Sequence, residues 1–309
     1  MMYENTTVEG FILLGFSEYP DFQVLLFFGF LIAYSLCVLE NTLLIVLVCS
    51  SSQLHTPMYF FLCNLSFLDI CLTTLIHPNF LVIFVKIRLI SFHDCMGQLY
   101  FYIALQSLEF FLLAVMSYDR YVAICNPLHY NIILNKKSCV LLSAVTWMIS
   151  LVDPAPIVQS ITKLSFCKSH KINHFLCDPV PLMKLSCGSS YRVGTVIVIE
   201  AILLALPAFL LTISSYISII SVILKIRSAK GRQKAFSTCS SHLTVVSLLY
   251  IIMTCIYFVP PSRTTSVNNS KKASLLNTVL IPILNPLIYS LRNKDVKHAF
   301  HALTKKRGS

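Results

Sequence analysis

Seven apolar stretches, each long enough to cross a lipid bilayer as a helix, take up most of this sequence. An α-helix needs about 20 mainly apolar residues to span the hydrocarbon layer. The stretches cover residues 23–49, 58–84, 96–120, 139–160, 193–224, 236–259 and 273–291. Only 12% of the chain is charged, against about 25% of a soluble domain. The sequence therefore predicts an all-α membrane protein, with a seven-transmembrane helix bundle over residues 23–291 and no separate soluble domain.

The distribution of Lys and Arg predicts the orientation of this bundle. Residues 1–22 hold four acids and no base, whereas five cations crowd the connection between the fifth and sixth stretches. Because basic residues favour the cytoplasmic side of a membrane, we expect residues 1–22 outside the cell and the tail, residues 292–309, inside. Asn5, in Asn-Thr-Thr, is then an external glycosylation acceptor. The net charge of +11 indicates contact with anionic membrane lipid, and we expect no nucleic acid partner.

The inner end of the third stretch carries charge where charge needs a reason. Residues 118–130 read Tyr-Asp-Arg-Tyr-Val-Ala-Ile-Cys-Asn-Pro-Leu-His-Tyr. An ionisable residue at the end of a span is costly unless it is paired or faces water, so Asp119 and Arg120 are candidate working residues. This sequence motif resembles the end of the third helix of rhodopsin-like G-protein-coupled receptors, and that of the olfactory (odorant) receptor family in particular. Only Ser117 departs, where that family usually has Ala.

Further stretches carry the same resemblance, in order and each at the right span. They are residues 11–16, 57–62, 65–69, 234–243 and 282–293. The resemblance implies a plasma-membrane receptor that binds a small-molecule odorant and activates a heterotrimeric stimulatory G protein, which raises cyclic AMP. It implies no cofactor and no enzyme activity. A receptor for an endogenous metabolite outside the olfactory epithelium is the alternative, because the same bundle would serve it.

Four of the twelve cysteines are expected on the outer side, where oxidation is favoured. They are Cys95, Cys167, Cys177 and Cys187, and by themselves they allow three pairings. The family resemblance implies a disulfide between Cys95 and Cys177, which leaves Cys167 for Cys187. Cys167, His170, His174 and Cys177 also have a spacing that a zinc site could use, but a disulfide would remove the thiolates. We expect no metal.

Helical spacing selects the side chains that could line a ligand pocket in the outer half of the bundle. In the third stretch these are Leu99, Tyr102, Ile103, Gln106, Ser107 and Phe110, and in the sixth they are Tyr250, Met253, Thr254 and Tyr257. Such stripes also fit ordinary core packing, but the family context favours a pocket among the third, fifth and sixth spans. Glu200, in the fifth span, and Glu40 depart from the family pattern. Glu200 is a candidate partner for an amine or a polar odorant group.

Carboxylates at membrane depth indicate a polar core. Asp69 and Glu109 must be protonated, hydrogen-bonded or share a cation. The resemblance places them with Asn41, Asn285 and Tyr289 in a network that rearranges on activation. Static hydrogen bonding between helices is the alternative.

The inner end is where the resemblance implies G-protein coupling. We expect Asp119 to hold Arg120 in a salt bridge whose release, beside Tyr121, presents the guanidinium to the partner protein. Pro286 removes a backbone hydrogen bond and permits a kink in the seventh span. The tail from Arg292 predicts a short amphipathic helix that lies on the membrane.

Overall fold

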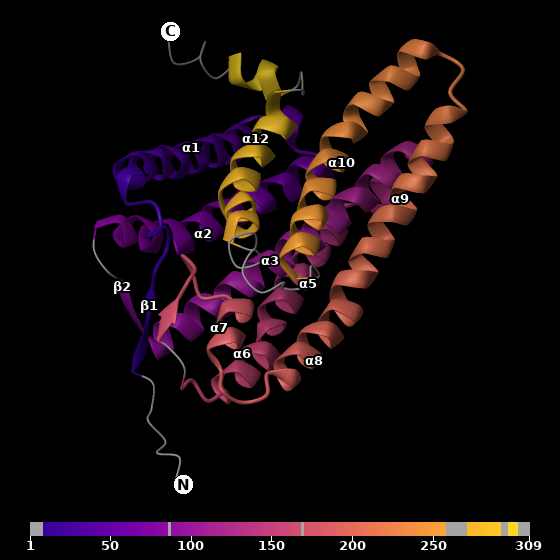
Figure 1. Cartoon of the computed structure of the whole chain (residues 1–309). Helices are drawn as coiled ribbons and strands as arrows, with labels where there is room; N and C mark the ends of the chain where they lie inside the picture. Colours follow the sequence, from indigo (N-terminus) through magenta and orange to yellow (C-terminus); the bar gives the residue numbers. More distant parts are fainter. Residues whose placement is uncertain (1–8, 86–87, 168–169, 258–270, 292–295, 302–309) are drawn as a thin grey trace.

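Long helices, packed side by side, make up most of the computed structural model, which describes residues 9–85, 88–167, 170–257, 271–291 and 296–301 (Figure 1). The long helices are α1 (Gln23–Ser50), α2 (Pro57–Val85), α3 (Phe92–Cys125), α5 (Lys136–Val152), α9 (Leu206–Leu224) and α10 (Ala229–Tyr257). The shorter helices are α4 (Tyr130–Ile133), α6 (Pro154–Thr162), α7 (Pro179–Leu185), α8 (Tyr191–Glu200) and α12 (Ile281–Leu291). Two π-helical turns, η4 (Ala201–Ala205) and η5 (Leu276–Leu280), continue α8 into α9 and lead into α12.

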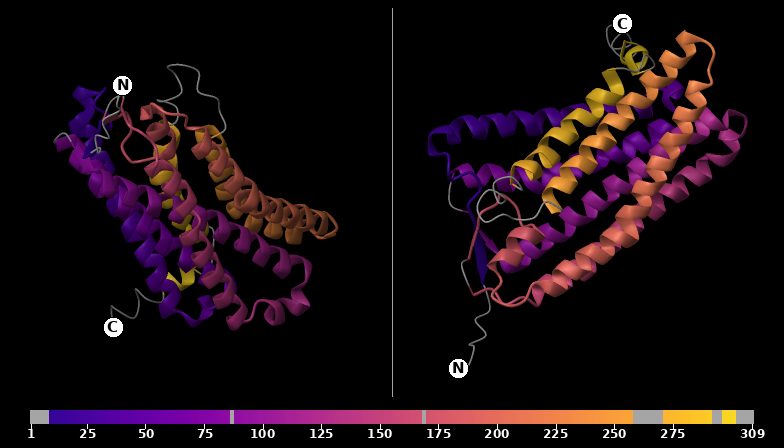
Figure 2. Two further views of the ribbon diagram at one scale, coloured as in Figure 1. Left: turned by 90° about the horizontal axis from the view of Figure 1, so that it is seen from below. Right: turned by 45° about the vertical axis from the view of Figure 1, so that its right-hand side comes forward.

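Helix α3 lies at the centre of the arrangement. It packs against α2, α5, α6 and α9, and more lightly against α10, whereas α12 packs against α1, α2 and α10. The two further views in Figure 2 show the same neighbours running roughly along one another. Because most of the other helices contact α3, its side chains connect the two ends of the molecule.

Five of the seven predicted spans appear as helices of membrane length and apolar composition. They cover residues 20–50, 57–84, 92–125, 136–162 and 191–224. In the sixth, α10 begins with the polar segment from Ala229, and its described apolar part is the shorter run His242–Thr254. In the seventh, residues 271–291 are helical without a break. The described residues thus show five clear spans and two further helices in the predicted places.

The helix ends follow from local sequence signals. At the start of α3, the Ser91 hydroxyl oxygen accepts from the Asp94 backbone N–H at 3.1 Å and donates to the Asp94 carboxylate at 2.7 Å, a reciprocal cap. The Asn135 side chain caps α5 by accepting from the Ser138 N–H at 3.0 Å. Pro57 begins α2, where a missing N–H costs no helical hydrogen bond.

Polarity along the helices is inverted relative to a soluble protein. On α9, Leu210, Ile217 and Leu224 are exposed at seven-residue spacing and so share one face. The opposite side of the same helix buries polar groups, including Thr212 and Ser215. An apolar outer surface around a partly polar interior is what a bilayer requires.

A small sheet at one end was not predicted. In the described part of the chain, β1 (Gly10–Leu13) pairs antiparallel with β2 (Arg88–Ser91) and parallel with β3 (Lys171–Ile172), in the order β2-β1-β3. The sheet lies at the opposite end from the α9–α10 connection and the helical turn 296–301 (Figure 1). Gly15 follows β1 with φ +52, a left-handed conformation in which an added Cβ would lie 2.5 Å from Ile83.

Candidate functional site

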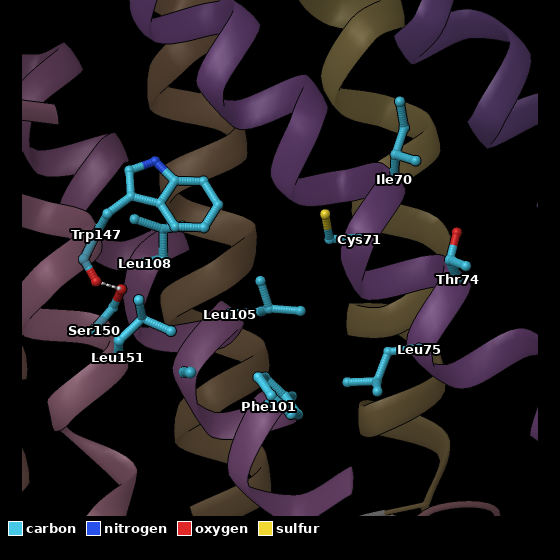
Figure 3. Close-up of a pocket in the computed structure, with 11 residues that line it drawn as sticks. Ile70, Cys71, Thr74, Leu75, Phe101, Leu105, Leu108, Trp147, Ser150 and Leu151 are labelled. Carbon is cyan, nitrogen blue, oxygen red and sulfur yellow. Dashed lines mark hydrogen bonds between the residues drawn. The ribbon is translucent and has the colours of Figure 1, made fainter. Parts of the chain in front are cut away.

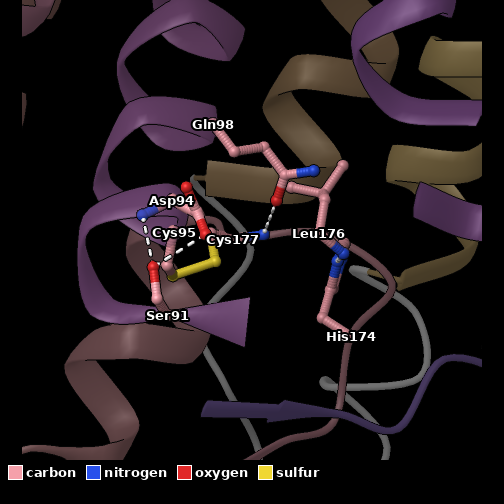
Figure 4. The surroundings of a disulfide bond; sticks show 7 residues. All are labelled: Ser91, Asp94, Cys95, Gln98, His174, Leu176 and Cys177. Atoms are coloured by element: carbon pink, nitrogen blue, oxygen red, sulfur yellow. Dashed lines mark hydrogen bonds between the residues drawn. A yellow bond between two sulfur atoms is a disulfide. The ribbon is translucent and has the colours of Figure 1, made fainter. Parts of the chain in front are cut away.

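A covalently tied loop covers the end of α3 that lies beside the sheet. One disulfide joins Cys95 of α3 to Cys177 and another joins Cys167 to Cys187, with Cα atoms 5.6 and 5.8 Å apart. This is the pairing that the family resemblance implied. Figure 4 shows a second contact at the same place, where the Cys177 N–H donates to Oε1 of Gln98 at 3.0 Å. Both candidate thiolates of the alternative zinc site are therefore oxidised, which excludes that site.

Lys271 joins this disulfide-tied loop to the N-terminal segment and to the seventh helical segment. Its Nζ donates to Oδ1 of Asn173 at 3.0 Å and lies 3.8 Å from Oε1 of Glu18. The same ammonium lies 4.9 Å from the centre of the Phe16 ring, a cation–π contact. The Lys271 side chain is only 3% exposed. Its burial lowers the pKa of the ammonium, while the Glu18 carboxylate opposes the shift.

His174 is buried beside this cluster. Its ring stacks on Phe175 with centroids 4.5 Å apart, and its Nδ1 accepts from the Leu176 backbone N–H at 3.3 Å. Burial lowers the pKa of His174 to about 3, and the charge of Lys271 contributes in the same direction. His174 is therefore neutral at physiological pH and acts as part of the packed lid.

The predicted stripe on α3 faces the seventh segment as well as the sixth. Leu99, Tyr102, Ile103 and Gln106 are all buried. Oε1 of Gln106 accepts from Nδ2 of Asn277 in η5, and Nε2 of Gln106 donates to Glu109 at 3.5 Å. Sequence reasoning missed Asn277, although a primary amide inside an apolar span was the available signal.

The sixth span meets α3 through aromatic rings. The Tyr250 ring lies 5.2 Å from the Phe110 ring and 4.8 Å from the Phe209 ring of α9, centre to centre. Met253 is buried, whereas Thr254 is exposed and donates to the Tyr250 carbonyl of its own helix at 2.7 Å. The side chain of Tyr257 lies outside the described residues. The structure thus brings Phe110 and Tyr250 together but turns Thr254 away from them.

Ser107 and Glu200 belong to a different face. The Ser107 hydroxyl donates to the Asp153 carboxylate, which sequence reasoning did not single out. Asp153 and Glu200 line a groove of 450 Å³ on the α5, α6 and α8 side, whose other lining residues are Met148, Ile149, Val152, Pro156 and Leu204. One oxygen of each carboxyl group is buried and receives no hydrogen bond from any described residue. This groove lies apart from the Gln106 face.

A larger groove, of 520 Å³, lies between α2, α3 and α5 and is lined almost wholly by apolar atoms (Figure 3). Its lining includes Leu75, Phe101, Leu105, Trp147 and Leu151. None of the predicted ligand-binding residues lines it. Its location on α2 and α5 and its apolar lining fit contact with lipid chains better than selective recognition.

The predicted polar core is assembled at mid-depth. Nδ2 of Asn285 donates to Oδ2 of Asp69 at 3.0 Å, and Nδ2 of Asn41 donates to the Pro282 carbonyl at 3.1 Å. Glu109 is buried beside Asn285, whose amide also acts on its carboxyl group. Pro286 lies inside α12 as expected. The side chain of Tyr289 lies outside the described residues.

The predicted salt bridge between Asp119 and Arg120 is wrong. Asp119 instead accepts from the Tyr130 hydroxyl at 2.7 Å, and no ion pair joins it to Arg120, although both residues are described. Consecutive residues on a helix point in different directions, so Asp119 and Arg120 do not face each other. Burial, with the Asp119 charge, raises the pKa of the Tyr130 hydroxyl. The Asp119 side chain thus ties the end of α3 to the following connection.

Arg120 lies close enough to α9 and α10 to act on them by its charge, as it does on Asp119 and Tyr130. Its charge acts on Tyr216 of α9 and on Cys239 and His242 of α10. The Tyr216 hydroxyl is hydrogen-bonded to Nδ1 of His242, and the two rings lie 5.8 Å apart. Tyr121, the next residue, packs against Tyr118 at 6.1 Å between ring centres. Asn5 lies outside the described residues.

Comparison with known proteins gives one consistent family. The family model described as olfactory receptor matches residues 30–306. The chain is 46% identical to olfactory receptor 1G1 of Gorilla gorilla gorilla over 96% of this chain and 95% of that protein. It is 46% identical to olfactory receptor 1L4 of Homo sapiens over 97% and 96% of the two chains. With human olfactory receptor 13A1 the identity is 47%, over 98% of this chain and 92% of the relative.

Proposed function

Because the chain belongs to the olfactory receptor family, whose members are odorant-sensing G-protein-coupled receptors, we propose that it binds a small odorant and activates a stimulatory G protein. The activated G protein raises cyclic AMP. The family consists of receptors and not enzymes, so we propose no chemical reaction of the bound ligand. Binding acts by shifting a population, and a ligand moves the equilibrium only by its difference in affinity for the two packings.

The proposed topology is a seven-helix bundle over residues 23–291, multi-pass in the plasma membrane. Residues 1–22, with the glycosylation acceptor Asn5, lie outside the cell, and residues 292–309 form the cytoplasmic tail. The disulfides support an oxidising environment at the sheet end. The exposed cations Lys225, Arg227, Lys230 and Arg232 at the opposite end support an inner membrane surface. Residues 296–301 are helical, which supports the short membrane-lying helix of the tail.

The proposed ligand site lies under the disulfide-tied loop, between α3, the fifth span and α10. Its central residues are Tyr102, Gln106, Phe110 and Tyr250, and Leu99, Ile103, Met253, Thr254 and Tyr257 belong to the wider set. The aromatic contacts of Tyr250 and the buried polar groups on α3 support this site, because small-ligand sites combine apolar walls with few polar groups. Ser107 and Glu200 form a separate polar element with Asp153.

The observation that carries the coupling step is the position of Arg120. Asp119 is engaged by Tyr130, and the charge of Arg120 acts on the hydrogen-bonded Tyr216–His242 pair of α9 and α10. Separation of α10 from α9 would expose Arg120 to a G-protein segment, whose acceptor groups could then bind the planar guanidinium group. Asn41, Asp69 and Glu109 with Asn285, Pro286 and Tyr289 form the network proposed to transmit the change. Tyr121 and the cations of the third inner connection border the docking surface.

The test is cyclic AMP production in cells that co-express the olfactory stimulatory G protein, screened with a chemically broad odorant set. Three versions are compared at equal surface staining: wild type, Arg120→Ala, and Lys136→Ala as a matched control. Lys136 is an exposed cation at the start of α5, outside the α9–α10 place. We expect at least one odorant to raise cyclic AMP in wild type and Lys136→Ala but not in Arg120→Ala. The proposal would be contradicted if the wild-type protein reached the cell surface and no odorant raised cyclic AMP.

A further inference from the structure

A chain of buried side-chain amides links the proposed ligand site to the polar core. Nδ2 of Asn277 donates to Oε1 of Gln106, and Nε2 of Gln106 donates to Oε2 of Glu109 at 3.5 Å. The exposed fractions are 0% for Asn277, 7% for Gln106 and 1% for Glu109. Asn277 lies in the π-helical turn η5, and π-helical turns are frequent at functional sites. Two helices that are not consecutive in sequence are thus joined by buried polar groups.

The hydrogen bonds of this chain have a fixed direction. In the structure the carboxyl oxygen of Glu109 accepts, so Gln106 turns its NH₂ toward Glu109 and its carbonyl toward Asn277. That carbonyl also only accepts, so Asn277 must in turn present its NH₂. The carbonyl oxygen Oδ1 of Asn277 is therefore left at the outer end of the chain. It is buried, and no described residue donates to it.

A second unused polar group lies beside this oxygen. Tyr102 is one helical turn outward from Gln106 on α3 and is fully buried. Its hydroxyl makes no hydrogen bond of normal geometry with any described residue, although the Asn277 side chain lies within reach of it. The Asn277 amide and the carboxyl groups of Glu109 and Asp178 all lie close enough to act on that hydroxyl. Unsatisfied buried polar groups are rare in folded proteins and indicate a water or a ligand group.

We propose that Asn277 and Tyr102 together select ligands with a hydroxyl group, meaning small alcohols and phenols. This rests on the proposed odorant-receptor function and names the chemical class for the same site. The ligand O–H donates to Oδ1 of Asn277, and the ligand oxygen accepts from the Tyr102 hydroxyl. A ketone or an ether of the same shape brings acceptors alone and leaves the Asn277 carbonyl buried without a donor. Such a mismatch in a site built for a hydroxyl group weakens binding strongly.

The experiment compares matched odorants in the cyclic AMP assay. The probes are straight-chain alcohols and phenols, each paired with its methyl ether and with a ketone of similar length. The variants are Asn277→Leu, which removes the acceptor, and Tyr102→Phe, which removes one hydroxyl at constant shape. Thr278→Val is the matched control, because Thr278 is equally buried in η5 but its hydroxyl bonds only to the Ser274 carbonyl of its own helix.

We expect alcohols to be more potent than their ethers and ketones by about tenfold or more in wild type and in Thr278→Val. Asn277→Leu should abolish this preference and Tyr102→Phe should reduce it. Glu109→Gln should weaken or reverse this preference. A glutamine at this position can donate to Gln106, which allows every hydrogen bond from residue 109 to Asn277 to run in the opposite direction. If Asn277→Leu does not reach the cell surface, Tyr102→Phe and Glu109→Gln decide.

Three results would overturn the inference. Equal potency of alcohols and ethers in wild type would mean that a water molecule, and not the ligand hydroxyl, bonds to Asn277 and Tyr102 in every complex. An unchanged preference in Asn277→Leu or Tyr102→Phe at normal surface level would show that other groups select the ligand. Responses to other odorants, lost in Arg120→Ala, with none to any alcohol, would reject the hydroxyl class and retain the receptor function. Silence toward every compound would contradict both.

Discussion

At the proposed outer end of the molecule, disulfides and backbone pairing join segments that are far apart in sequence, whereas at the proposed inner end the described links are single side-chain hydrogen bonds. The outer end has Cys95–Cys177, Cys167–Cys187 and the three-stranded sheet, with Lys271 bonded to Asn173 beneath. The described inner contacts include Asp119 with Tyr130 and Tyr216 with His242. A covalent or multiply bonded assembly resists rearrangement, while single hydrogen bonds net about 0.5–1.5 kcal/mol each. The difference indicates that the sheet end resists rearrangement, whereas the contacts at the opposite end can change more easily.

The largest expected effect comes from removing the disulfide between the loop and α3. Cys95→Ser or Cys177→Ser should cost about 2–5 kcal/mol of unfolding free energy and most of the surface expression. Cys167→Ser should cost less, because its bridge closes 20 residues of sequence separation instead of 82. Surface staining and thermal unfolding in detergent measure both. Cys49→Ser, a free and exposed cysteine, is the control. Wild-type stability of Cys95→Ser would show that the outer end is not fixed by this bond.

Acid should loosen the outer lid through His174. Its pKa is lowered to about 3 by burial, whereas an unfolded histidine titrates near 6.5. Between these values the unfolded state binds more protons, so stability falls as the pH drops from about 6.5, by about 2 kcal/mol at about pH 5. His174→Asn can keep the acceptor for the Leu176 N–H and should flatten this dependence. Thermal unfolding at several pH values is the measurement, and an unchanged slope in the variant would assign the acid sensitivity elsewhere.

The inner end should respond to a single hydroxyl group. Tyr130→Phe removes the donor to Asp119 and should cost about 1 kcal/mol of inactive-state stability. The expected readout is a rise in cyclic AMP without odorant at equal surface level. Tyr118→Phe is the control, because Tyr118 lies at the same end and no described residue forms a hydrogen bond with its hydroxyl. No change in basal signalling would mean that the Asp119–Tyr130 hydrogen bond has a structural role but does not favour the inactive over the active conformation.

The smallest expected effect concerns the partly exposed member of the Lys271 cluster. Glu18→Gln removes a carboxylate 3.8 Å from Lys271 but keeps an oxygen that can accept from Asn173. Glu18 is about a third exposed, so the loss should stay below about 1 kcal/mol and shrink further at high salt. Thermal unfolding at low and high salt, with Glu9→Gln as an exposed control, measures it. A loss of several kcal/mol would show that this ion pair is a main support of the lid.

Sequence reasoning was most reliable where the signal is local. Apolar length located five clear spans and the two further helices, because crossing a bilayer constrains every residue of a segment. The resemblance implied both disulfides. The small sheet was missed because β1 has four residues and gains its partners from segments about 80 and 160 positions away along the chain.

The candidate site shows the same limit residue by residue. Helical spacing identified Gln106, and charge at the end of a span identified Arg120. Neither signal could say that Gln106 meets Asn277 or that Arg120 acts on Tyr216 and His242. Asp153, Asn173 and Lys271 were not singled out at all.

The sequence alone indicated that this chain is a multi-pass membrane protein and which family it resembles, because hydrophobicity and sequence motifs are properties of contiguous residues. Only the tertiary structure decided that Asp119 binds Tyr130, that Lys271 joins Glu18 and Asn173, and that Asn277 completes an amide chain from α3. A helical period fixes the direction of a side chain around its own axis. The partner in that direction depends on how the other helices pack.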